Sequence, residues 1–85
     1  MLFELGQIVT TPGARALLGA NFSVLLDRYT HGDWGVLDPE DAAMNDAALT
    51  TGDRILGSYT HGGQKVWIIT EWDRSITTIL LPSEY

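Results

Sequence analysis

The sequence predicts an α+β fold, with an antiparallel sheet of three to four strands packed against about three short helices. Two observations support this class. Residues 11–52 combine helix start and stop signals with apolar side chains at spacings of three and four. Residues 54–81 are instead rich in β-branched and aromatic side chains, which two turns divide into three segments. At 85 residues, the chain is expected to form a single domain over residues 1–85.

The first predicted strand spans residues 5–10, and a short helix is expected to follow it. Thr11 offers a side-chain oxygen as the N-cap of that helix. Pro12 suits the first helical position, because the N–H that proline lacks would have no partner there in any case. The helix is expected to end at Gly19.

Two further helices are predicted in the middle of the chain. Asn21 is expected to cap a helix over residues 22–29, in which apolar residues recur at spacings of three and four. Asp38 and Pro39 form the clearest helix start, since an acid also stands three residues after the N-cap, in the capping-box position. This helix is expected to end at Gly52. Its apolar stripe is thin and consists of Leu37, Met44, Ala47 and Ala48, with Leu49 at the margin.

The C-terminal half predicts an antiparallel meander of three strands, over residues 55–60, 65–70 and 76–81. The first connection, residues 61–64, contains two glycines that supply the positive φ of a hairpin turn. The second connection covers residues 71–75. We expect the N-terminal strand to join one edge of this sheet and the helices to pack on one of its faces.

One segment supplies all of the net charge. Residues 33–53 contain six of the 11 acids and none of the five Lys and Arg residues, and the whole chain carries −6. The six acids are Asp33, Asp38, Glu40, Asp41, Asp46 and Asp53. A field of this sign repels nucleic-acid and membrane phosphates and attracts basic protein surfaces. We therefore expect the partner to be a basic surface of another protein, with no direct nucleic-acid binding and no membrane binding.

The acidic segment has two interpretations. In the first, it is a solvated face whose carboxylates complement the helix dipole, which accounts for Asp38, Glu40 and Asp41. The dipole does not account for Asp46 and Asp53, or for the absence of basic partners four residues away. In the second interpretation, the helix and the loop before it bind a partner. The predicted partner-binding residues are Asp33, Trp34, Asp38, Glu40, Asp41, Asp46 and Asp53.

The three tryptophans have different expected environments. Trp34 is expected either to fold back over the core or to serve as an exposed anchor, because tryptophan is favoured at interface hot spots. Trp67 lies on the central strand and is expected in the core. Trp72, Asp73 and Arg74 form a secondary candidate patch in a turn. There, either Asp73 bonds the backbone and Arg74 pairs with a carboxylate, or Arg74 reaches a carboxylate or phosphate ligand.

No catalytic constellation is visible. The chain has no cysteine, no phosphate-binding Gly-rich loop with lysine, and no Ser-His-Asp set with a nucleophile elbow. His31 and His61 lie in predicted loops, and a metal site or small enzyme built on them is a third alternative. We therefore expect a non-enzymatic protein with no metal and no cofactor. The chain shows no signal peptide and no membrane span, which predicts a cytoplasmic location.

Several short stretches match a known pattern over nearly the whole chain. They are Thr11-Pro12-Gly13-Ala14, Gly32-Asp33-Trp34-Gly35, Asn45-Asp46, Ala48-Leu49, Trp67-Ile68-Ile69-Thr70-Glu71, Asp73-Arg74-Ser75, Thr77-Thr78, Leu80-Leu81-Pro82 and Tyr85. In these stretches the sequence resembles a family of small uncharacterised bacterial proteins labelled plasmid-related. The resemblance implies carriage on a mobile genetic element, where small genes often encode proteins that blunt host defences. It supplies no catalytic residues, and Trp72 stands where a small residue is expected.

Charge and resemblance together predict a non-enzymatic acidic interaction module. Its concrete form is an inhibitor of a host defence nuclease (anti-CRISPR or anti-restriction) that mimics nucleic acid, with the acids of the third helix facing a basic channel. The alternative is a structural or small-ligand-binding homodimer that uses the sheet and the turn at residues 72–74.

Overall fold

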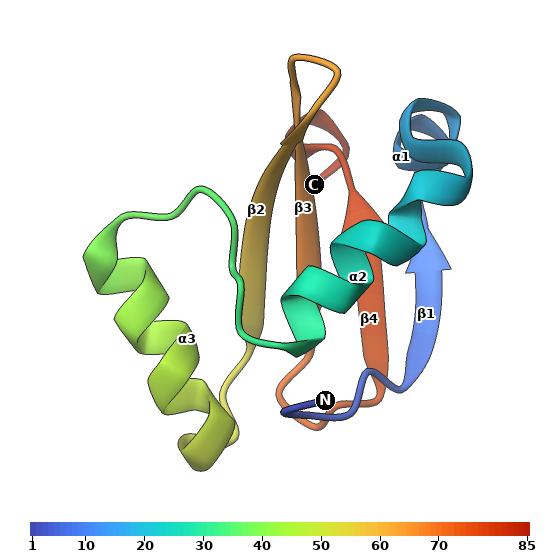
Figure 1. Cartoon of the computed structure of the whole chain (residues 1–85). Coiled ribbons are helices and arrows are strands. Elements are labelled where there is room, and N and C mark those ends of the chain that lie inside the picture. Colours follow the sequence, from blue (N-terminus) through green and yellow to red (C-terminus); the bar gives the residue numbers. More distant parts are fainter.

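A four-stranded sheet and three α-helices make up the fold (Figure 1). The computed structural model describes residues 1–85. The helices are α1 (Pro12–Leu18), α2 (Phe22–Thr30) and α3 (Pro39–Thr51), and the 3₁₀ turns are η1 (Gly19–Asn21) and η2 (Pro82–Glu84). The strands are β1 (Gln7–Thr10), β2 (Ile55–His61), β3 (Gln64–Thr70) and β4 (Ile76–Leu80). The predicted α+β class is confirmed.

The sheet is mixed, with the strand order β1-β4-β3-β2. β2, β3 and β4 form the predicted antiparallel meander, but β1 pairs with β4 in parallel. The expectation of a purely antiparallel sheet is therefore wrong. The reason is that the helices return the chain to the end of the sheet where β1 begins, so β2 runs in the direction of β1 (Figure 1). A meander of three strands repeats the direction of its first strand in its last, which makes β4 parallel to β1.

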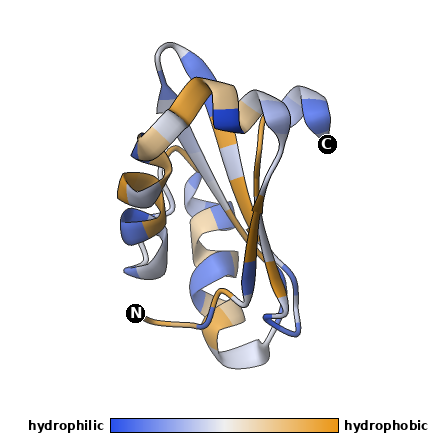
Figure 2. Cartoon of the chain, turned by 90° about the vertical axis from the view of Figure 1, so that its right-hand side faces the viewer, coloured by the Kyte–Doolittle hydropathy of each residue, from blue (hydrophilic) through white to orange (hydrophobic).

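α1 and α2 cover one face of the sheet, and the core lies between them and that face (Figure 2). The buried apolar residues there are Ala14, Leu18, Leu25, Leu26, Tyr29, Ile55, Tyr59, Val66, Ile68 and Ile79. Trp67 is out of phase with Val66 and Ile68, so its side chain lies on the opposite face of β3. It is only half-buried there, and its ring lies 5.9 Å from that of Tyr85. The expected core position of Trp67 is therefore wrong.

A chain of hydroxyl groups crosses the core. The hydroxyl of Tyr29 donates to the Ile55 carbonyl at 3.1 Å and lies 2.7 Å from Thr70 Oγ1. Thr70 Oγ1 lies 2.8 Å from Thr77 Oγ1, which donates to the Leu5 carbonyl at 2.6 Å. The hydroxyl groups of Tyr29, Thr70 and Thr77 supply three protons for these four contacts, so one proton must lie between two acceptor oxygens. Burial raises the pKa of Tyr29 far above its ordinary value, which keeps the phenol protonated. The chain joins α2, three strands and the N-terminal segment.

α3 lies beside the edge strand β2 instead of over a sheet face (Figure 1). Asn45 and Ala48 are the two buried residues of the helix, and the half-buried Ala42 and Leu49 also pack against the core. Met44 and Ala47 are exposed, so their expected place in an apolar stripe is wrong. The Asn45 side chain donates to the Leu56 carbonyl at 2.7 Å and accepts from the Leu56 N–H at 3.2 Å. One amide side chain thereby pairs with the strand edge as a neighbouring strand would.

Two of the three predicted helix caps are present. Thr11 Oγ1 accepts from the Ala14 N–H at 3.4 Å, and Asp38 Oδ1 accepts from the Asp41 N–H at 2.9 Å. Asn21 makes no cap hydrogen bond, so that prediction is wrong. The cause is that η1 continues directly into α2, which gives Asn21 helical angles (φ −72°, ψ −8°) in place of the extended conformation of an N-cap.

Candidate functional site

The loop before α3 folds inward at Trp34. The Trp34 side chain is 5% exposed, and its ring lies 5.7 Å from the Tyr29 ring and 6.0 Å from the Phe3 ring. This confirms the interpretation in which Trp34 folds over the core. The alternative interpretation, an exposed anchor in the partner-binding set, is wrong, because aromatic neighbours enclose the ring.

Trp34 also connects this loop to α3 and to β2. Its indole N–H donates to Asp46 Oδ1 at 2.9 Å, and its carbonyl accepts from the Ser58 N–H at 2.9 Å. The Val36 N–H then donates to the Ser58 carbonyl at 2.6 Å. Asp46, which was expected to bind a partner, therefore orients Trp34 within the chain.

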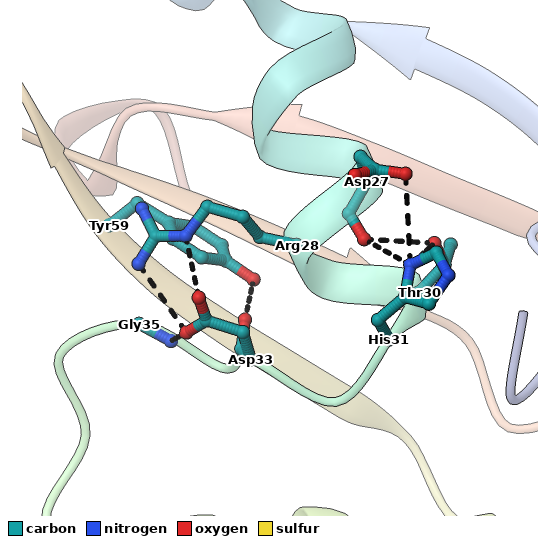
Figure 3. A network of polar contacts seen from close by, with 7 residues as sticks. All are labelled: Asp27, Arg28, Thr30, His31, Asp33, Gly35 and Tyr59. Carbon is teal, nitrogen blue, oxygen red and sulfur yellow. Dashed lines mark hydrogen bonds and ion pairs between the residues drawn. The ribbon is translucent and has the colours of Figure 1, made fainter.

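The negative charge of Asp33 is balanced by contacts within the chain (Figure 3). Its carboxylate accepts from Arg28 Nε at 2.7 Å and from the Gly35 N–H at 3.1 Å. The Tyr59 hydroxyl donates to the Asp33 carbonyl at 2.7 Å, and the Arg28 guanidinium lies 5.0 Å from the centre of the Tyr59 ring. The hydrogen bond from Arg28 is the main cause of the lowered pKa of the Asp33 carboxyl. Asp33 therefore holds the loop, and its charge is already balanced by Arg28.

This arrangement predicts a small acid sensitivity. Because the folded state lowers the Asp33 pKa below its ordinary 3.8, the stabilisation is complete above pH 3.8 and is lost as the pH falls through the lowered folded value. The side chain is 52% exposed, so we expect about 0.5 kcal/mol or less. Urea unfolding of the wild type and the Asp33→Asn variant should differ most at neutral pH and converge in acid. A difference that does not change with pH would contradict this.

The two histidines serve different parts of the chain. His31 Nδ1 lies 2.7 Å from the Asp27 carbonyl at the end of α2 (Figure 3), whereas His61 is the last residue of β2. No group of three or more His, Cys, Asp or Glu side chains is arranged to hold a metal ion. None of the helices has the length and apolar character needed to cross a membrane.

A groove of about 570 Å³ runs between α3 and the start of β2. Its apolar lining consists of Leu37, Met44, Ala47 and Leu56, and its polar lining of Asp41, Asn45, Asp53 and Arg54. Arg54 is turned toward the C-terminus, where it donates to the Tyr85 hydroxyl at 2.8 Å. Sequence reasoning missed Arg54 and Leu56. They join the site only because Asn45 docks α3 on the strand edge, and no local pattern reports that contact.

The acids of α3 surround the helix and do not share one face. The ion pairs of the structure are Arg28–Asp33 and His31–Asp27, so no acid of α3 is paired. Asp41 lines the groove toward β2, while Asp46 contacts the Trp34 loop. Asp41, near the start of α3, and Asp53, beyond its end, line opposite ends of the same groove. Asp46 is not part of the groove lining.

The secondary candidate patch divides into an exposed residue and two turn residues. Trp72 is 68% exposed. Asp73 accepts from the Ser75 N–H at 3.1 Å and from its hydroxyl at 2.6 Å, as predicted for a turn aspartate, and these bonds lower its pKa. Arg74 points inward and bonds backbone carbonyls. The nearest are those of Asp53, at 2.6 Å, and Ala48, at 2.9 Å. The expected carboxylate partner of Arg74 is therefore wrong, and backbone carbonyls occupy the donors with which it was expected to reach an external ligand.

Comparisons with protein-family models, with curated proteins and with solved structures found no match to this chain. The geometry of the site therefore carries the functional argument. The site is a groove that is half apolar and half polar, lined by two carboxylates without an ion pair and by Arg54.

Proposed function

We propose that this chain is a non-enzymatic interaction protein. Its acids at α3 and at the groove between α3 and β2 bind a basic surface of another protein. The observation that carries the proposal is the state of the acids at the groove between α3 and β2. Asp41 and Asp53 line that groove without an ion pair, and Glu40 on the same helix is also unpaired. Arg54 lines the same groove but forms no ion pair with either carboxylate, so both can pair with a cation from a partner and speed its association.

The groove suits an Arg or Lys side chain. Leu37 and Met44 offer apolar surface for the aliphatic stem, and the Asp41 carboxylate near the start of α3 offers an acceptor for the charged end, while Asp53 beyond the end of α3 can accept from a second cation. Met44 is 68% exposed, and a flexible methionine adapts readily to the shape of a partner. We therefore assign the contact to the groove, with Glu40 beside it. Asp38 and Asp46 have internal roles as a helix cap and as the acceptor for Trp34.

We infer that the partner is a protein that handles nucleic acid, because the channels of such proteins are rich in Lys and Arg. The resemblance to plasmid-related bacterial proteins supports a narrower form of the proposal. In that form the chain comes from a mobile genetic element, acts in the cytoplasm, and inhibits a host defence nuclease as a mimic of nucleic acid. Anti-CRISPR and anti-restriction proteins are the two classes concerned.

The experiment compares two charge reversals of equal size. The variant Asp41→Lys/Asp53→Lys changes the groove, and Glu4→Lys/Asp27→Lys makes the same change in net charge on exposed residues elsewhere. Each is titrated against purified nucleic-acid-guided and restriction nucleases, with inhibition and affinity measured at two salt concentrations. We expect the groove variant to bind roughly 100-fold more weakly and the control to change about threefold or less.

Circular dichroism establishes that both variants are folded before binding is compared. Equal losses in the two variants would assign the effect to net charge and would refute the groove. Full inhibition by the groove variant would refute binding through α3.

A second candidate function, a structural or small-ligand-binding homodimer that uses the sheet, is favoured by the open sheet face. No α-helix covers the face opposite α1 and α2, where only η2 and Tyr85 pack against part of β3 (Figure 2), and Ile76, Trp72 and Tyr85 are exposed. Light scattering at several salt concentrations tests this candidate, because apolar association persists at high salt while contacts of exposed charges weaken. A chain that is monomeric at every salt concentration would refute it.

A further inference from the structure

The two edges of the sheet are protected to different degrees. On the β2 edge, Asn45 pairs with both backbone groups of Leu56, and the loop at Trp34 and Val36 pairs with both backbone groups of Ser58. Two separate elements therefore cover this edge, which otherwise would be open to pairing with another strand.

The β1 edge has no such cover. The Gln7 N–H donates to the Ser75 carbonyl at 2.9 Å, and the Thr11 N–H donates to the Ile79 carbonyl at 3.0 Å. Backbone groups alternate in direction along a strand, so the N–H and C=O of the even-numbered residues, 8 and 10, point away from β4. Figure 2 faces this edge, and no segment runs alongside it. The strand is Gln-Ile-Val-Thr and contains no charge, proline or bulge that would discourage pairing.

A groove of about 670 Å³ adjoins the open edge. It lies between β1 and the α1–η1 segment, and its lining includes Ile8, Ala14, Gly19 and Phe22. Ile8 is 42% exposed, and Phe22 is also exposed. The edge therefore combines unpaired backbone groups with apolar surface, the two features that strand addition uses.

We propose that β1 pairs antiparallel with β1 of a second copy of this chain, about a twofold axis at Val9. With Ile8 opposite Thr10 of the second copy, each outward N–H meets an outward C=O, and four hydrogen bonds form. The two Val9 side chains then face each other across the axis on the open side of the sheet. The result is a continuous sheet of eight strands, with α1 and α2 of both copies on one face.

The distribution of charge favours the β1 edge over the β2 edge for pairing with a second copy. α3 lies beyond β2, at the opposite edge from β1 (Figure 1). Pairing through β1 puts the two acidic helices at opposite ends of the sheet, separated by more than seven strand spacings, or roughly 34 Å. That distance is several Debye lengths at physiological salt, so their repulsion is screened. Pairing through β2 would instead bring the two acidic helices together. The inference does not rest on binding through α3.

The test uses one substitution at matched positions on the two edges. Thr10→Pro removes an outward N–H from β1 and leaves the bonds to β4 in place. Thr60→Pro is its control on β2, where the N–H of the even-numbered residues also points outward. Sedimentation measures the mass against 9.3 kDa for one chain. We expect a wild-type dimer, an unchanged Thr60→Pro dimer, and dissociation of Thr10→Pro at about 30-fold higher concentration, because the symmetric dimer loses two hydrogen bonds.

A charge exchange at the axis keeps the inference testable if Thr10→Pro does not fold. Val9→Lys and Val9→Asp each place like charges opposite one another, and we expect both variants to be monomers. Their mixture should form a heterodimer, because the charges are then opposite. A wild-type chain that is monomeric at millimolar concentration, a mixture that stays monomeric, or a dimer that survives Val9→Lys would overturn the proposal.

Discussion

Replacing Arg74 with alanine is expected to lower the free energy of unfolding by about 3–4 kcal/mol. The guanidinium donates to the Ala48 carbonyl near the end of α3 and to the Asp53 carbonyl before β2. It also donates to the Glu71 and Trp72 carbonyls of its own turn, at 3.2 and 3.3 Å. Without it, the end of α3 loses its connection to the β3–β4 turn. Urea unfolding measures the change.

Two further substitutions at this position separate the side chain from the backbone. Arg74 is the one non-glycine residue with positive φ, at 60°, a conformation that costs about 1 kcal/mol for a residue with Cβ. Arg74→Gly should therefore be about 1 kcal/mol less destabilising than Arg74→Ala. Arg74→Lys keeps the charge but not the two-pronged donor, and we expect it to resemble alanine. A stable Arg74→Ala variant would refute the bridging role.

Replacing Asn45 with alanine is expected to destabilise the chain by about 2–4 kcal/mol and to release α3 from β2. The substitution removes two hydrogen bonds and leaves both backbone groups of Leu56 without a partner. Ala48 would then be the only fully buried residue of the helix, with Ala42 and Leu49 half-buried beside it. Hydrogen exchange should show faster exchange in α3 than in β3, and the uncovered β2 edge should promote aggregation.

The controls for Asn45 vary one property at a time. Asn45→Asp keeps an acceptor for the Leu56 N–H but sets a negative charge against the Leu56 carbonyl, so we expect it to destabilise as well. Thr50→Ala changes an exposed residue of the same helix and should be nearly neutral. Equal exchange rates in α3 for the wild type and Asn45→Ala would contradict the docking role. Loss of partner binding by Asn45→Ala, with every acid intact, would be expected from the groove proposal.

Much of the fold was predictable because its signals are local. The cap at Asp38 and Asp41, the proline at the start of α1 and the glycines of the β2–β3 turn act within a few residues of chain. The direction of β1 was not predictable in this way. It depends on the end of the sheet to which the helices return the chain, which is a property of the whole packing.

The candidate site was less predictable than the fold. The charge count identified Asp41 and Asp53, which both line the groove. The same count also selected Asp33 and Asp46, which have internal partners. Composition does not distinguish a carboxylate that holds a loop from one that does not, because the difference lies in which donors reach it: Asp53 accepts only from the nearby Thr51 hydroxyl, at 2.8 Å. Arg74 was misjudged for the same reason.

The sequence alone therefore determined the secondary structure and the acidic polarity of residues 33–53, since propensity, capping and charge belong to short segments. Tertiary structure alone decided that Trp34 is buried, that Arg74 is an internal bridge and that α3 borders a groove at the edge of β2. It also decided which sheet edge is covered. These outcomes depend on contacts between distant residues such as Asn45 and Leu56, whose meeting is set by the packing of the helices on the sheet.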